Sequence, residues 1–275
     1  MARIVVIAHA YDDFENQNYL LQTLVRHWIA NGHRVSLRNG IADLPDADIA
    51  VLHTDLSLTP PEYVDACGRY PVVVNGAVTD IRKTRISRHL LRPDDGWTGP
   101  VIVKTDLNSG GIPELRTRHL SQLQGQQADL SARIVVTDRP YPILRSAADV
   151  TEAIWSNPGL VVERFLPERE AEEFCVRAWV FCGNRERCTR YRSASPIVKT
   201  GNMGTRESVP VPDELRAERK RLRFDYGKFD FVVRGGEVVL FDVNRTPGAP
   251  PPPLTDEVEK SNADLARGIE DMLSS

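Results

Sequence analysis

The chain has 275 residues, of which 41% are hydrophobic and 27% are charged, and its formal net charge is −3. A chain of this length can bury a sizeable core, which excludes a peptide scaffold and wholesale disorder. Its apolar runs are all shorter than the ~20 residues of a membrane span. The near-neutral charge gives no global attraction to nucleic acid or anionic lipid. We therefore expect a globular protein that binds neither nucleic acid nor a membrane.

The compartment follows from the first residues and from the cysteines. Residues 1–13 run from a short apolar stretch straight into acids, which indicates a first β-strand and not a secretory signal. Cys67, Cys175, Cys182 and Cys188 form neither a CxxC pair nor a metal-ligand spacing, which is typical of reduced thiols. We expect a cytoplasmic protein.

The first 76 residues alternate between strand and helix patterns. A β-branched run at 3–8 is followed by apolar residues at helical spacing from Tyr19 to Ile29. Weaker repeats of the same pattern follow, with strands at 33–37, 48–53 and 71–75 and a helix near 61–68. This alternation predicts a small parallel sheet of Rossmann-like type. The segment has no GxGxxG motif, so it does not indicate a dinucleotide site.

A second lobe is predicted after a connecting segment. The basic stretch 79–91 is expected to form a helix, and Arg92–Gly96 to form a boundary because proline and glycine cluster there. The lobe itself is predicted to be α+β, with strands at 101–104, 133–137 and 160–165, a turn at 108–111 and a helix around 147–155.

The last third of the chain contains sequence patterns typical of antiparallel strands. Strands are predicted at 174–181 and 187–193, and residues 229–233 and 238–244 flank a glycine turn typical of a hairpin. Helices are expected at 213–223 and, after the proline run 250–253, at about 256–273. The basic residues of the first of these helices alternate with glutamates, which favours a solvent-facing helix over a nucleic-acid surface.

Three oxygen-bearing side chains meet on the predicted hairpin. Asp242 and Asn244 are two apart and therefore share one face of their strand, and Asp230 lies on the partner strand. Oxygen ligands of this kind suit Mg²⁺, which keeps its remaining positions for water and phosphates. The alternative is a pair of solvated acids near a turn. The apolar neighbours of Asp242 favour the metal site, because an unpartnered carboxylate there would be costly.

A phosphate site is predicted from Lys104 and the turn after it. Lys104 ends a buried strand, and the amides of the Gly110-Gly111 loop can approach an anion. The same residues are equally compatible with a generic hairpin tip.

The chain resembles the ATP-grasp superfamily in the order of its motifs. These are Lys83, then IVK followed by SGG, then VVERFL (161–166), and finally D-x11-D-x-N followed by TPG. The resemblance is to glutathione-synthetase and RimK-like ligases and covers residues 70–249. It implies an ATP-grasp fold of mixed α/β and α+β class. The implied parts are an N-terminal Rossmann-like pre-ATP-grasp domain (1–78), a connecting helix and linker (79–96), a central lobe (97–166) and a C-terminal lobe with the metal site (167–275).

The resemblance also implies a nucleotide site. Lys83 and Lys104 would touch the phosphates of ATP, and Glu170, or less favourably Glu168, would hold the ribose. The adenine would pair with a hinge made of Glu163, Arg164, Phe165 and Leu166. The metal ligands would be Asp230, Asp242 and Asn244, holding Mg²⁺ or alternatively Mn²⁺. The middle ligand in the superfamily is most often glutamate, so the shorter Asp242 leaves open whether one or two ions bind.

Further basic residues would face the reacting groups. Arg177 resembles the arginine that meets the transferred phosphate, although an outward-facing strand residue is the alternative. Arg190 and Lys199 would hold an acyl phosphate or a substrate carboxylate, with Asn202 beside the cofactor. His9, Asp12 and Asp13 follow the first strand, where α/β sheets place ligand loops, although such loop residues are more often incidental.

The predicted activity is that of an ATP-dependent carboxylate–amine ligase. It would form an amide or peptide bond through an acyl phosphate, with a small-molecule or peptide carboxylate and an amine as substrates. The alternatives are a kinase of the same fold acting on a hydroxyl, and a nucleotide-binding partner subunit without turnover. A homo-oligomer is compatible with the sequence. Serine hydrolase, zinc protease and Walker-type ATPase readings lack their motifs.

Overall fold

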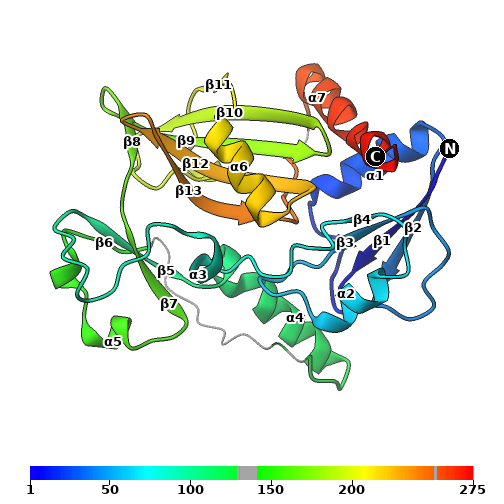
Figure 1. Cartoon of the computed structure of the whole chain (residues 1–275), viewed down its shortest axis with the longest axis horizontal. Helices are drawn as coiled ribbons and strands as arrows, with labels where there is room; N and C mark the ends of the chain where they lie inside the picture. Colours follow the sequence, from blue (N-terminus) through cyan, green and yellow to red (C-terminus); the bar gives the residue numbers. More distant parts are fainter. Residues whose placement is uncertain (129, 131–140, 251–252, 275) are drawn as a thin grey trace.

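The computed structural model describes residues 1–128, 130, 141–250 and 253–274. The strand predicted at 133–137 and part of the proline run at 250–253 lie outside the described residues. Figure 1 shows three sheets, one in each third of the chain, with the antiparallel C-terminal sheet above the other two.

The N-terminal sheet is four-stranded and parallel, in the order β2-β1-β3-β4. Its elements are β1 (Arg3–Ala8), α1 (Leu20–Ala30), β2 (Arg34–Asn39), β3 (Ile49–His53), α2 (Pro61–Cys67) and β4 (Val73–Val74). Alternate residues of β1 point to opposite faces, so Ile4 and Val6 pack in one core with α1 while Val5 and Ile7 pack in another with α2. The predicted alternation of strands and helices around a parallel sheet is confirmed.

The central sheet is antiparallel, in the order β6-β5-β7. Its elements are β5 (Val101–Thr105), η1 (Asn108–Gly111), α4 (Ile112–Leu123), β6 (Ile143–Leu144), η2 (Ala147–Asp149), α5 (Glu152–Trp155) and β7 (Leu160–Arg164). The glycine-rich turn does not join two strands. Ser109, Gly110 and Gly111 all have positive φ angles and lead directly into α4, a helix that the sequence reading missed.

The connecting segment is helical over only four residues, in α3 (Lys83–Ile86), which corrects the helix predicted over 79–91. Competing backbone hydrogen bonds explain the difference. The amide of Leu91 donates to Val162, and the carbonyl of His89 accepts from Arg164, so this part of the segment runs beside β7 in an extended form.

The C-terminal sheet is six-stranded and antiparallel. Its order is β11-β10-β9-β12-β13, with β8 also paired to β9. Its strands are β8 (Glu168–Glu170), β9 (Glu173–Cys182), β10 (Arg185–Ser193), β11 (Arg206–Ser208), β12 (Tyr226–Arg234) and β13 (Glu237–Asn244), and its helical segments are η3 (Thr200–Asn202), α6 (Asp213–Leu222), α7 (Asp256–Ala266) and α8 (Gly268–Leu273). The predicted hairpin is confirmed as β12 and β13. Leu215 of α6 packs on one face of the sheet against Trp179, Phe181 and Phe229.

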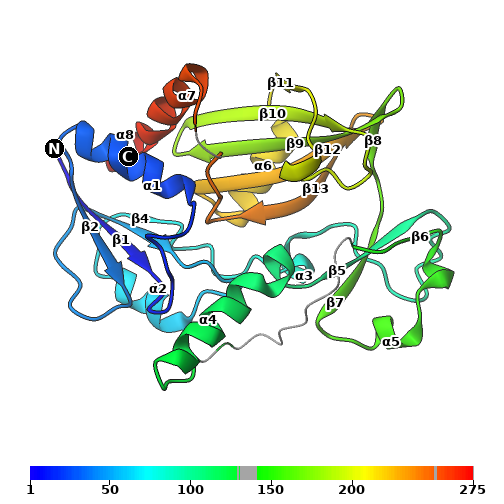
Figure 2. The ribbon, with the colours of Figure 1, turned by 180° about the vertical axis from the view of Figure 1, so that it is seen from behind.

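The N-terminal and C-terminal parts share a core. Helices α1 and α7 lie side by side in both views (Figure 2), and the indole of Trp28 donates to the carbonyl of Ala266 at 2.7 Å. Arg245, which follows β13, is 1% exposed, and its guanidinium donates to Thr54, Leu56, Thr59 and Val78 of the N-terminal part. The end of β13 is therefore fastened to the N-terminal lobe.

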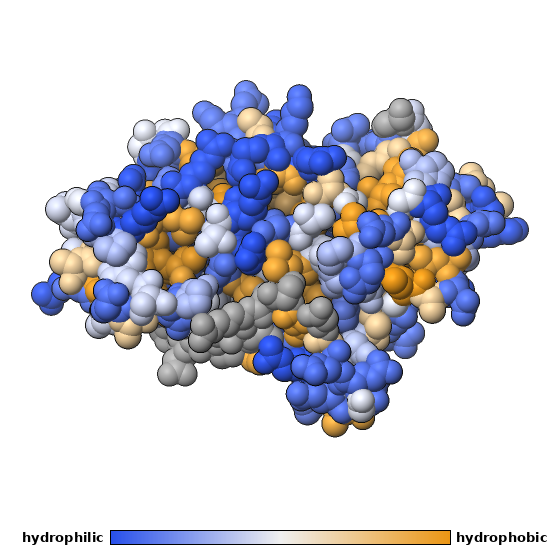
Figure 3. Space-filling view, turned by 60° about the horizontal axis from the view of Figure 1, so that its bottom comes forward, coloured by the Kyte–Doolittle hydropathy of each residue, from blue (hydrophilic) through white to orange (hydrophobic). Residues whose placement is uncertain are grey.

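The surface is mostly hydrophilic on the face shown in Figure 3, and its hydrophobic residues form patches. Among the described residues, no helix combines the length and the apolar character needed to cross a bilayer.

Candidate active site

A cleft of about 790 Å³ lies where the three parts of the chain meet. Each part contributes charged side chains to it: Asp55 comes from the N-terminal part, Lys104 and Glu163 from the central sheet, and Asp242 with its neighbours from the C-terminal sheet. Lys83 is added by the connecting segment. Of the residues expected from the sequence to form the site, nine line this cleft: Lys83, Lys104, Glu163, Arg164, Phe165, Lys199, Asp230, Asp242 and Asn244.

The expected metal ligands share one face of the C-terminal sheet. Asp230 of β12 lies directly opposite Asp242 of β13, and Lys228 lies opposite Asn244. The alternation of strand side chains puts all four on the face away from α6. Beyond Asp230 the register shifts at a β-bulge, which adds Phe241 as an extra residue on β13 and brings it to the cleft.

Two lysines neutralise the facing carboxylates. Lys83 Nζ lies 2.5 Å from Asp242 Oδ1, and Lys228 Nζ lies 2.9 Å from Asp230 Oδ2. Burial is the largest single influence on the pKa of Lys83 and lowers it, but the attraction and hydrogen bond to Asp242, together with the charge of Glu163, raise the pKa overall. The pKa of Lys228 is raised chiefly by attraction to Asp230. Both side chains are therefore held as cations beside the acids.

The donor set fits a divalent cation. Two carboxylates and the Asn244 amide on one face are the hard oxygen donors that Mg²⁺ takes. The lysines show that cations are stabilised at this position. Among the described residues, no group of three or more His, Cys, Asp or Glu side chains forms a competing metal site.

Lys104 and Glu163 form a buried ion pair at the floor of the cleft. Lys104 Nζ lies 2.6 Å from Glu163 Oε2 and 5.5 Å from the centre of the Phe241 ring. The other carboxylate oxygen of Glu163, Oε1, is buried and has no hydrogen-bond partner within the described parts of the chain. Because an unpaired buried acceptor is costly, a donor placed at this oxygen would be stabilising.

The expected hinge is already hydrogen bonded. The amides of Arg164 and Phe165 donate at 2.9 Å to the carbonyls of His89 and Pro100. These two amides are therefore not free to pair with a base, and the pairing of adenine with this hinge stays a prediction. The Arg164 guanidinium stacks on Trp97, and Leu166 packs in a small core with Val232, away from the cleft lining.

Arg177 does not reach the cleft. It lies opposite Phe231 in the sheet register, one residue out of phase with Asp230, so it points to the α6 face. There its guanidinium donates to Glu168 at 2.8 and 3.1 Å. In this structure Arg177 is therefore not placed to make the expected contact with a phosphate bound in the cleft.

Arg190 and Glu170 belong to the same face as Arg177. Arg190 lies opposite Arg177, and its guanidinium is 2.9 Å from Glu170 Oε2 and 2.5 Å from Glu207 Oε1. The structure thus places these two residues in a charged network and not at the ribose or the acyl phosphate. Glu168, the alternative ribose ligand, forms an ion pair with Arg177.

Lys199 and Asn202 lie at the end of the cleft near the loop after β10. Lys199 lines the cleft and sits over the Tyr141 ring at 5.4 Å. Asn202 lines an adjoining hollow of about 250 Å³, where its side chain accepts from the Lys199 amide at 2.7 Å. It therefore shapes the loop that carries Lys199.

The sequence reading missed several cleft residues. Lys228 precedes Asp230 by two, so strand periodicity could have placed it on the same face. Arg116 lies on α4, whose start was signalled by Pro113 and Glu114. Asp55, Tyr19 and Thr246 come together only in the fold, and no local signal predicted them.

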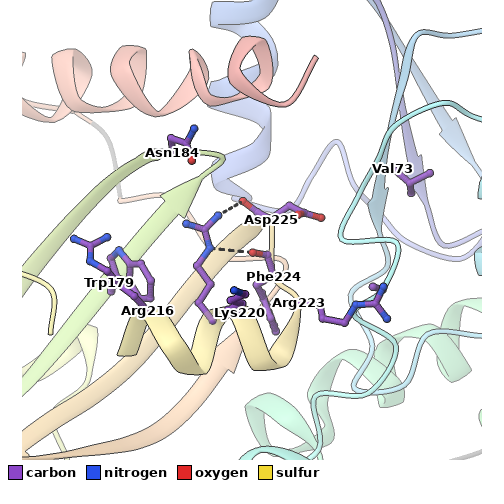
Figure 4. Close-up of a pocket in the computed structure, with 10 residues that line it drawn as sticks. Val73, Trp179, Asn184, Arg216, Lys220, Arg223, Phe224 and Asp225 are labelled. Carbon is purple, nitrogen blue, oxygen red and sulfur yellow. Dashed lines mark hydrogen bonds between the residues drawn. The ribbon is translucent and has the colours of Figure 1, made fainter. Parts of the chain in front are cut away.

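A second hollow of about 550 Å³ lies between α6 and the N-terminal lobe (Figure 4). It is rich in arginine, but Arg216 and Arg219 already have partners. Arg216 is paired with Glu186 at 2.6 Å, and Arg219 donates to three backbone carbonyls, those of Gly183, Phe224 and Asp225. Both arginines are therefore held by the C-terminal part itself.

The three-sheet architecture with the cleft between the sheets defines the ATP-grasp fold, as the sequence resemblance implied. The chain is similar over its full length to a RimK domain ATP-grasp protein from Sphaerobacter thermophilus, of which it also covers 100%, with a TM-score of 0.53 and 15% identity. D-alanine–D-alanine ligase from Bacillus anthracis complexed with ATP gives a TM-score of 0.52 and 16% identity, covering 100% of this chain and 98% of that one. For a D-cycloserine synthetase the values are 0.51 and 9%, with 98% and 99% covered. No family model and no curated protein sequence matches the chain.

Proposed function

We propose that the protein is an ATP-dependent carboxylate–amine ligase. The observation that carries the proposal is the convergence of oxygen donors and lysines in one cleft of an ATP-grasp fold: Asp230, Asp242 and Asn244 with Lys83, Lys104 and Lys228. Two of the similar structures are named as ligase and synthetase, and one of them holds ATP. In this proposal the acids take Mg²⁺, with Mn²⁺ as the alternative, and the cleft takes ATP.

The cleft residues have distinct proposed roles. Asp230, Asp242 and Asn244 would hold Mg²⁺, which when bound offsets the charge of the phosphates. Lys83 and Lys228, released from the acids, would pair with phosphate oxygens. Lys104 reaches the same region from the central sheet. These cations stabilise the charge that develops on the transferred group, and the protein needs no nucleophile of its own.

The proposed reaction has two steps. The γ-phosphoryl group of ATP passes to a carboxylate oxygen, which gives ADP and an acyl phosphate. An amine then attacks the acyl carbon, forms the amide and releases inorganic phosphate together with a proton. The cleft would have to exclude water during the reaction, because water would otherwise hydrolyse the acyl phosphate.

The residues around Glu163 support the proposal that this end of the cleft binds the base of the nucleotide. Its unpaired Oε1 can accept a hydrogen bond from an amino group of a base. Lys199 and Tyr141 line the same region.

The test is an incubation of the protein with ATP, Mg²⁺ and pooled amino acids, followed by quantification of ADP and mass spectrometry of the products. We expect ADP, phosphate and a new amide. ADP with a phosphoester would instead identify a kinase. Nucleotide binding without ADP release would identify a binding subunit, and both outcomes contradict the proposal.

A further inference from the structure

The hollow between α6 and the N-terminal lobe is separate from the proposed active site. It lies on the face of the C-terminal sheet that α6 covers, whereas Asp230 and Asp242 lie on the opposite face. Among the described residues, none lines both this hollow and the cleft. Its volume of about 550 Å³ is within the range of ~300–1,000 Å³ that small-molecule sites have. The hollow therefore has room for a ligand of its own.

Positive charge exceeds negative charge around this hollow. Four cationic side chains line it: Arg216, Arg219, Lys220 and Arg223. Of the described residues, Asp225 is the one acid in the lining, and Glu186 adds a second acid by pairing with Arg216. Four cations against two acids leave an excess of two positive charges, which favours an anionic ligand.

Lys220 and Arg223 carry the excess charge. Both residues are exposed, and neither side chain forms a hydrogen bond or an ion pair within the described parts of the chain. They lie three residues apart at the end of α6, and Arg223 extends toward the N-terminal lobe (Figure 4). Two neighbouring cations with unused donors suit two linked anionic groups.

Arg219 adds a partly buried donor to the same hollow. Its guanidinium lies over the Phe181 ring, 4.1 Å from the ring centre, and donates through Nε and Nη2 to three backbone carbonyls. Its Nη1 group has no acceptor among the described residues. Burial lowers the pKa of Arg219, and the charge of Asp225 offsets this only in part. An anion in the hollow would therefore stabilise this guanidinium.

The C-terminal end of α6 explains only part of the positive charge. The end of a helix carries about half a negative charge, which one cation offsets. Arg219 already donates to the carbonyl of Phe224 just past the helix, and Arg221 in the last turn pairs with Glu218. Lys220 and Arg223 therefore exceed what the helix end requires.

Arg223 occupies a backbone position that usually belongs to glycine. Its φ angle of 61° lies in the left-handed region, where a residue with a side chain costs roughly 1–2 kcal/mol. A glycine would end α6 without this cost. The arginine instead brings a further cation to the hollow.

We propose that this hollow binds the diphosphate group of a small molecule, with Lys220 and Arg223 each pairing with one phosphate. Free pyrophosphate and the diphosphate of a nucleotide share this chemistry. The cations come from the C-terminal part, and Val73 and Ala77 of the N-terminal lobe line the same hollow, so the ligand would lie between the two parts. The proposal does not depend on the ligase function, because the residues of the cleft take no part in it.

The experiment is calorimetric titration of the intact protein with pyrophosphate, without Mg²⁺ and at physiological ionic strength. Lys220→Gln and Arg223→Gln each remove one charge at an exposed position. We expect each to weaken binding about tenfold, and the two together at least about thirtyfold, because each removes a charge-assisted hydrogen bond. Thermal melts check that each variant folds, and if the double variant does not, the single variants decide.

Arg221→Gln is the matched control. It removes the same charge from the same turn of α6, but Arg221 is paired with Glu218 and does not line the hollow. We expect its affinity to stay within about twofold of the parent, since exposed charges away from the site are screened by salt. The titrations are repeated in a Lys228→Met background, which removes a cation of the cleft, and the hollow variants should have the same effect there.

A parallel titration with ADP identifies the source of the diphosphate. A loss of affinity for both ligands in the hollow variants indicates a nucleotide, and a loss for pyrophosphate alone indicates the free anion. Absence of pyrophosphate binding by the parent, unchanged affinity in the folded variants, or an equal loss in Arg221→Gln overturns the diphosphate site. Each of these results leaves the ligase proposal, which is tested by ADP release, unaffected.

Discussion

Asp230 and Asp242 face each other across β12 and β13, and each carboxylate is paired with a lysine: Asp230 with Lys228 of the same strand, and Asp242 with Lys83 of α3. The two lysines offset the repulsion between the acids. Binding of Mg²⁺ would displace both lysines, which would then be available to phosphate oxygens. The first predictions concern this exchange of partners.

Removing the charge of Asp242 should abolish turnover. Asp242→Asn replaces an anionic metal donor with a neutral amide and leaves the buried Lys83 without its acid, so we expect metal-dependent ADP release to fall at least ~10²-fold. A coupled ADP assay across a Mg²⁺ titration measures the effect. Glu237→Gln, at an exposed position on the same strand, is the control. Turnover within about threefold of the parent would remove Asp242 from the site.

Lys228 should act on the chemical step. Lys228→Met removes a cation that lies 2.9 Å from Asp230 and lines the cleft, so we expect kcat to fall about 10²-fold. The exposed Lys260→Met on α7 should leave kcat unchanged. Steady-state kinetics with varied ATP separates kcat from KM. An unchanged kcat with a raised KM would show that Lys228 contributes only to binding.

Arg177 should matter for stability and not for turnover. Arg177→Met leaves the buried Glu168 with only the more distant Arg190, at 3.6 Å, as a cation among the described residues, so we expect the free energy of unfolding to fall by about 2–4 kcal/mol. ADP release by the folded variant should stay within about threefold of the parent. Urea denaturation and the ADP assay together check this. The exposed pair Arg169–Glu172 offers the control Arg169→Met, which should cost less than about 0.5 kcal/mol.

Asp12 should make stability depend on pH. Burial, and after it the charge of Asp55, raises the pKa of Asp12 from 3.8 to about 7. Between these values the folded chain keeps a proton that the unfolded chain releases. The free energy of unfolding should therefore fall as pH rises from about 4 to 7 and level off above that.

Asp12→Asn removes this titration. We expect the variant to match the parent near pH 4 and to exceed its free energy of unfolding by about 2–4 kcal/mol at pH 8. Urea denaturation over this pH range is the measurement, with the exposed Asp65→Asn on α2 as the control. A pH profile of the parent that Asp12→Asn does not flatten would show that Asp12 ionises normally.

Strand periodicity predicted the central feature of the site. In an antiparallel hairpin, side chains two apart share a face, and this was enough to bring Asp242, Asn244 and Asp230 together. The parallel N-terminal sheet could equally be predicted from the sequence, because its strands and helices carry strong local patterns. The domain boundaries given in the sequence analysis stay predictions.

Strand periodicity would also have corrected the predicted position of Arg177. It shares its phase on β9 with Trp179 and Phe181, the aromatic residues that pack under α6, whereas Asp230 is out of phase with Phe229 and Phe231. The resemblance to a family placed Arg177 by its position along the chain. The strand phase places it on the other face.

The remaining differences come from contacts between distant segments. The connecting segment has a helical composition, yet hydrogen bonds to β7 hold its second half extended. Asp55 meets Thr246 across 191 positions of sequence, and such a contact leaves no local pattern. Helix α4 was missed although proline and glutamate marked its start, because the preceding glycines were interpreted as a hairpin tip.

Arg245 limits how the C-terminal sheet and the N-terminal lobe can move relative to each other. The residue lies between Asn244 and Thr246, and its buried guanidinium donates hydrogen bonds to the carbonyls of Thr54, Leu56 and Val78. A rotation between the two parts would break these hydrogen bonds and leave a buried cation without partners. Any opening of the cleft would therefore come from movement of the central sheet, with the other two parts acting as one rigid frame.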